Sequence, residues 1–134
     1  MPHRIEERDG LHVILISGEI TAAESRERFR LIAELLQRGP ALILLAYGQG
    51  SRFLAGPGET MQLQLSLSES IGDSESGAIA FLCPDEVLFG ICRQFQLLAA
   101  GSRIKLAVFR DGPQAEEWLA DTRKENAFDT LFRY

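Results

Sequence analysis

Three short, apolar runs constrain the fold of this chain more than any other feature. They are LHVILIS at 11–17, ALILLA at 41–46 and AIAFLC at 78–83. Apolar runs of this length between turn residues are typical of strands that are buried on both faces, as in parallel sheets covered by helices. Asp9-Gly10 predicts a turn that pairs the first run with a polar strand at 4–7, and the alternating IKLAVF at 104–109 predicts a last strand.

Helical patterns separate these strands. Thr21 and Glu24 have the spacing of a capping box, and apolar residues from Phe29 to Leu36 follow at the spacing of a core-facing helix before Gly39-Pro40 ends it. A second helix is predicted from Pro84-Asp85 to about Ala100, apolar around most of its circumference, and a third begins at Asp111.

Residues 60–71 fit two structures. Met61, Leu63, Leu65 and Leu67 alternate with polar residues, which favours a strand, yet they also cover a broad face of a helix. We favour the helix, because a parallel strand on either side requires a crossover connection.

The order of these elements predicts a single α/β domain over residues 1–121. We expect one mixed, mostly parallel sheet of about five strands, an antiparallel edge hairpin and about four helices. Residues 122–134 form a charged tail that still carries large apolar groups such as Phe128 and Phe132, so we expect it to pack on the domain or on a partner.

Composition argues against several functions. With 14 Lys and Arg against 19 Asp and Glu, the net charge of −5 does not favour nucleic acid or anionic membranes. Cys83 and Cys92 predict buried free thiols, and with two histidines they do not form a zinc pattern. We expect no metal and no cofactor. The first ten residues lack a signal-peptide core, and the apolar runs are too short for membrane insertion, so we expect a cytoplasmic protein.

The loop YGQGSRFLAGPG at 47–58 is the candidate ligand site. It carries four glycines and follows a central strand, at the edge of the sheet where α/β proteins usually bind ligands. It has neither a phosphate-binding lysine motif nor the dinucleotide glycine spacing. The candidate residues are Tyr47, Gly50, Ser51, Arg52 and Phe53.

The chain resembles the STAS fold of anti-sigma factor antagonists and, more closely, the SpoIIAA-like group, also described as STAS/SEC14-like. The stretches that carry the resemblance are RDGLHVILISGEIT, AIAFLCPDEVLFGICRQFQLLA and IKLAVFRDGPQAEEWL. In the phosphorylated antagonists, a partner kinase modifies a serine in a D-x-S-x-x-D-S motif after the third strand. Here the corresponding loop has Ser51 without those aspartates, so the resemblance does not imply that switch.

No catalytic constellation emerges from these residues. We therefore expect a non-enzymatic STAS-like regulatory or protein-interaction module, with a protein partner or a second copy of itself in a homodimer. Its predicted interface consists of apolar residues of the 84–100 helix and of the tail: Leu88, Phe89, Cys92, Phe95, Phe128 and Phe132. The alternative is a SEC14-like carrier of a small apolar or anionic ligand, which an enclosed cavity lined by Phe81, Phe89, Phe95 and Leu97 would favour. An enzyme that uses the 47–58 loop is the third reading.

Overall fold

The structure is a computed structural model that describes residues 3–8, 10–38, 41–72 and 77–131. Along the chain its elements are β1 (His3–Arg8), β2 (Leu11–Ile16), β3 (Glu19–Ile20), α1 (Ala22–Gln37), β4 (Leu42–Tyr47), β5 (Arg52–Phe53), α2 (Pro57–Gly72), β6 (Ala78–Leu82), α3 (Glu86–Leu98), β7 (Lys105–Phe109) and α4 (Gly112–Leu131). Five strands form a sheet in the order β1-β2-β4-β6-β7, with β1 antiparallel to β2 and the other neighbours parallel. The predicted fold class is therefore confirmed.

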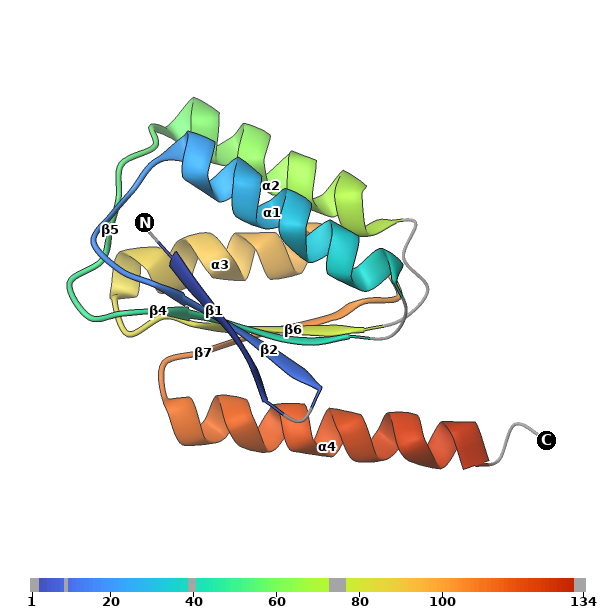
Figure 1. The fold of residues 1–134 in the computed structure, drawn as a ribbon. Coiled ribbons are helices and arrows are strands. Elements are labelled where there is room, and N and C mark those ends of the chain that lie inside the picture. Colours follow the sequence, from blue (N-terminus) through green and yellow to red (C-terminus); the bar gives the residue numbers. More distant parts are fainter. Residues whose placement is uncertain (1–2, 9, 39–40, 73–76, 132–134) are drawn as a thin grey trace.

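The topology explains where the helices lie. From β2 to β7 the parallel strands follow one another across the sheet in a single direction, so right-handed connections place α1, α2 and α3 on the same face. Figure 1 shows these three helices on one side of the sheet and α4 on the other. Because both faces are covered, β4 is buried along its whole length, as its unbroken apolar run predicts.

Each face of the sheet has its own core. Toward α1–α3, Phe95 packs edge-on against Phe29 at 5.2 Å between ring centroids and stacks with Phe81 at 5.9 Å. Toward α4, smaller side chains such as Ala80 allow Ala115 and Leu119 to pack closely on the sheet.

Local signals account for the helix starts and the hairpin. Thr21 Oγ1 accepts a hydrogen bond from Glu24 N at 3.2 Å, and Asp85 Oδ2 accepts one from Leu88 N at 3.0 Å, so both residues are N-caps. Gly10, in the turn between β1 and β2, has φ +82°, which glycine adopts without strain. The helix predicted over 60–71 is confirmed as part of α2.

Two elements differ from the sequence prediction. The 47–58 loop contains β5, which pairs with β3 as a short parallel ladder away from the main sheet. The last helix is longer than expected and includes residues 122–131, since neither glycine nor proline interrupts the chain between Gln114 and Leu131.

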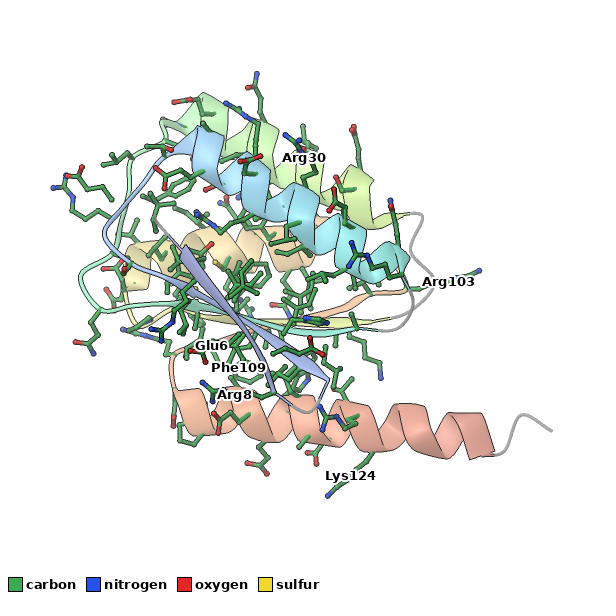
Figure 2. All side chains as sticks on the ribbon, viewed as in Figure 1. Glu6, Arg8, Arg30, Arg103, Phe109 and Lys124 are labelled. Atoms are coloured by element: carbon green, nitrogen blue, oxygen red, sulfur yellow. The ribbon has the colours of Figure 1, made fainter. Side chains whose placement is uncertain are left out.

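Charged side chains project around the outside of the domain, as Figure 2 shows for Arg30, Arg103 and Lys124. On β1, Arg8 donates a hydrogen bond to Glu6 at 2.8 Å. Within the described residues, no helix combines the length and the apolar character needed to cross a membrane.

Candidate functional site

The five predicted ligand-binding residues do not converge on one site. Tyr47 and Ser51 are buried, Phe53 packs partly against the core, and Gly50 and Arg52 are exposed. The Ser51 hydroxyl donates to the Gly48 carbonyl at 2.7 Å, so it is engaged within its own loop.

The backbone of this loop is also occupied. Arg52 N donates to Gly18 O at 3.0 Å, and Leu54 N donates to Ile20 O at 2.8 Å. These amides hold the loop against the β2–α1 connection and are not available to an anion. The structure thus shows an ordered ladder where the sequence suggested a glycine-rich cradle.

A buried polar cluster lies at this end of the sheet; the sequence predicted its two buried thiols and singled out Tyr47, but it missed Arg28. It consists of Arg28 on α1, Tyr47 at the end of β4, Cys83 after β6 and Cys92 on α3. The two sulfur atoms are 3.2 Å apart, and both thiols are free. The helical period could have placed Arg28 here, since it lies three residues after buried Ser25 and four before buried Ile32.

Arg28 is the least expected member of this cluster. Its side chain is fully buried, and Nη2 donates to Ser25 Oγ at 3.2 Å. Within the described residues, neither Nε nor Nη1 of Arg28 has a hydrogen-bond partner, and the same is true of Glu24 Oε2. Burying a guanidinium group without full pairing costs several kcal/mol, to order of magnitude.

Burial favours the protonated forms of Tyr47 and Cys92. It raises the pKa of Tyr47 well above its usual value, the nearby thiols Cys92 and Cys83 raise it further, and Arg28 opposes them. Burial likewise raises the pKa of the Cys92 thiol, with a smaller contribution from its hydrogen bond to Cys83. Burial lowers the pKa of Arg28. A protonated thiol without access to solvent is a poor nucleophile.

Metal binding has equally little support. Within the residues that the structure describes, no group of three or more His, Cys, Asp or Glu side chains could hold a metal ion.

The predicted interface residues of α3 face the interior. Leu88, Cys92 and Phe95 belong to the core between the helices and the sheet. Phe89 is partly buried beneath the Arg110 guanidinium, 6.0 Å from its ring centroid. A partner could reach the first three only if the core opened, so an interface on α3 must use other side chains.

Two of the predicted interface residues belong to the tail. The backbone of Phe128 lies in α4, but its side chain is outside the described part of the structure. The whole of Phe132 is outside it as well.

Exposed apolar side chains of α2 and α3 line a groove between these two helices. Met61 and Leu65 line it from α2, and Leu97 and Leu98 line it from α3, around a volume of about 370 Å³. Met61 is 62% exposed and Leu97 70% exposed. We call this surface the α2–α3 face.

Two glutamines complete the α2–α3 face. Gln64 Nε2 donates to Gln94 Oε1 at 2.6 Å and lies 3.4 Å from the Ile91 carbonyl oxygen. The residues that line the groove therefore include no charged side chain. Such a surface suits contact with another apolar surface, whereas it offers no group for acid–base chemistry.

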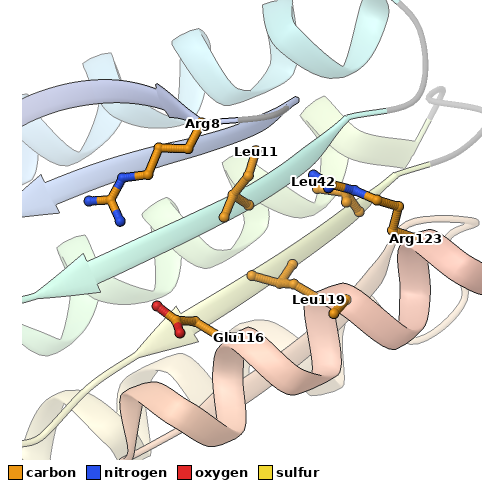
Figure 3. Close-up of a pocket in the computed structure, with 7 residues that line it drawn as sticks. Arg8, Leu11, Leu42, Glu116, Leu119 and Arg123 are labelled. Carbon is orange, nitrogen blue, oxygen red and sulfur yellow. The ribbon is translucent and has the colours of Figure 1, made fainter.

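A smaller pocket of about 230 Å³ lies on the opposite side of the sheet, between the β1–β2 hairpin and α4. Figure 3 shows its apolar floor, which includes Leu11 and Leu119, and its rim of Arg8, Arg123 and Glu116. The rim thus carries two guanidinium groups and one carboxylate, and Arg8 also donates to Glu6.

Comparison with known proteins adds little beyond the fold. No protein-family model matches the sequence, and no curated protein is significantly similar to it. Among solved structures, the chain is similar to an uncharacterised DUF3478-family protein with a SpoIIAA-like fold from Shewanella loihica PV-4. The identity is 18%, the match covers 87% of this chain and 91% of that one, and the TM-score is 0.46. We take no functional argument from this similarity.

Proposed function

We propose that this chain is a non-enzymatic, STAS-like interaction module that binds a protein through its α2–α3 face. The observation that carries the proposal is the apolar groove lined by Met61, Leu65, Leu97 and Leu98, which is open to solvent. Large apolar side chains gathered on a surface cost free energy in water, and contiguous patches of this kind mark interaction sites.

The pattern of α2 supports this proposal. In a helix, residues two apart lie on nearly opposite sides, so the alternating apolar residues of α2 form two separate stripes. Leu63 and Leu67 are buried in the domain, whereas Met61 and Leu65 face outward. One stripe builds the domain, and the other has no role within it.

The other two functions have less support. The rings of Phe29, Phe81 and Phe95 pack against one another in the interior, where the predicted ligand cavity would lie. An enzyme would require an accessible reactive group, whereas the thiols of the buried cluster are enclosed. Ser51 is also buried, which supports a module without the serine switch. The stretch 122–134 remains a proposed second contact.

Site-specific photo-cross-linking in the cells that naturally produce the protein tests the proposed function. A benzophenone amino acid replaces Gln94 on the α2–α3 face or, as a control, the exposed Glu117 on α4. We expect position 94 to yield one cross-linked species of defined mass that disappears in a Leu97→Glu background. The proposal is contradicted if position 94 cross-links no more than position 117.

A further inference from the structure

An exposed glycine in the middle of α3 points to what covers this face. A Cβ built on Gly90 would meet nothing within 4 Å, so no packing contact within the described domain requires glycine there. Glycine inside a helix is less favourable than alanine. Its absent side chain does, however, leave room for another helix to approach α3 closely.

Gly90 belongs to an exposed stripe of uncharged residues on α3, which the charged residues Glu86 and Arg93 flank on one side. Val87, Gly90, Gln94 and Leu97 follow one another at intervals of three, four and three residues, which places them on one side of α3. All four are exposed. This stripe extends the α2–α3 face toward the N-terminus of the helix.

The chemistry of the α2–α3 face is self-complementary. Leu97 and Met61 project from it, the groove and Gly90 are recessed, and glutamine amides both donate and accept hydrogen bonds. A two-fold interface sets one patch against its own copy, so it needs projections and recesses of the same chemical kind.

Charge is compatible with a second copy. Two chains of net charge −5 repel each other at long range, but the groove is lined by uncharged residues and brings no like charges into direct contact. A partner selected by charge would instead be met by an acidic or a basic surface.

We propose that a second copy of this chain packs its own α2–α3 pair on this one, about a two-fold axis. The contact is a bundle of four helices, with Gly90 at the point of closest approach. This inference rests on the proposed function, because it names the partner of the same face.

The size of the face sets the expected strength. At 1.5 Å per residue, the 16 residues of α2 and the 13 of α3 extend about 24 Å and about 20 Å. Two adjacent helices about 20 Å wide give a contact of roughly 900 Å² for both copies together, just below the usual range of specific interfaces. We therefore expect a weak, reversible dimer.

Sedimentation velocity from micromolar to near-millimolar concentration tests the dimer. We expect the wild-type chain to shift reversibly from one to two copies. Leu97→Glu places like charges across the interface, and Gly90→Gln fills the recess with a good helix former; each should weaken association about tenfold or more. Circular dichroism confirms that both variants remain folded.

Ile5→Gln on β1 is the matched control, since Ile5 is 46% exposed, close to the 48% of Leu65 in the groove, but lies outside the α2–α3 face. It should leave association unchanged. A wild-type chain that stays monomeric overturns the inference, yet the proposed function survives if position 94 cross-links to a different protein. A dimer that tolerates both Leu97→Glu and Gly90→Gln overturns this interface.

Discussion

The buried cluster at the carboxyl end of the sheet and the α2–α3 face contrast in both chemistry and exposure. The cluster holds thiols, a phenol and a guanidinium group, all enclosed between the helices and the sheet. The α2–α3 face holds leucine, methionine and glutamine side chains, largely open to solvent. The thiols and the phenol of the cluster are thus enclosed, whereas the residues that line the α2–α3 groove carry no titratable group.

The proposed binding function rests on this contrast. Catalysis requires titratable groups that reach a substrate with pKa values suited to proton transfer. Here burial holds the pKa of Tyr47 and Cys92 above their ordinary values and shields both groups from a substrate.

The largest effect should come from α3 itself, which serves both the core and the α2–α3 face. Phe95 is 3% exposed and Leu97 is 70% exposed, two residues apart. Phe95→Ala should lower the free energy of unfolding by about 3–5 kcal/mol, because it removes the ring that packs on Phe29 and Phe81. Leu97→Ala should change it by less than about 0.5 kcal/mol. Urea denaturation of a dilute sample measures both changes in the free energy of unfolding. If the two variants lost similar amounts of stability, the two sides of α3 would not differ as described.

Replacement of the buried guanidinium should stabilise the fold. Arg28→Met keeps the length of the side chain and removes an incompletely paired charge, so the free energy of unfolding should rise by about 1–3 kcal/mol. Arg26→Met, at an exposed position on the same helix, is the control and should have an effect near zero. A large loss of stability in Arg28→Met would contradict this account, because it would show that the buried guanidinium is well compensated within the fold.

Stability should also fall in alkaline solution. The folded-state pKa values of Cys92 and Tyr47 are raised, so as pH rises the unfolded chain loses these protons first. Stability is then intact below about pH 8 and falls through the ordinary pKa values of about 8.5 and 10, by up to about 1.4 kcal/mol per pH unit for each group. Tyr47→Phe should reduce the slope above about pH 10, as measured by denaturation at a series of pH values. An equal slope in wild type and variant would mean that the phenol is not buried as described.

The smallest effect separates stability from association. Gly90→Ala should raise the free energy of unfolding of the monomer by about 0.5–1 kcal/mol, because alanine is the better helix former and its Cβ meets nothing in the domain. The same change should weaken the dimer by a smaller factor than Gly90→Gln. If it lowered the stability of the monomer, the glycine would serve the domain and not the interface.

The sequence predicted the strands well because burial on both faces leaves an unambiguous pattern. The runs at 41–46 and 78–83 correspond to β4 and β6 to within one residue at each end. By contrast, β3 and β5 have two residues each and depend on backbone hydrogen bonds between segments more than 30 residues apart, which no local pattern reveals.

The proposed binding surface was harder to predict than the fold. The apolar circumference of α3 indicated a surplus of apolar groups but not which of them would face outward. Leu88 and Phe95 were expected at the surface and are buried, whereas Leu97 is exposed. The alternating pattern of α2 was informative in retrospect, since a helix that satisfies it must present a second apolar stripe.

A dilution series followed by ¹H–¹⁵N correlation spectra tests the central claim most directly, because each backbone amide reports its own environment. We expect concentration-dependent shifts at residues of α2 and α3, around Met61, Leu65, Gly90 and Leu97, with the amides of α4 and β1 unchanged. Shifts confined to α4 or to the hairpin would contradict it.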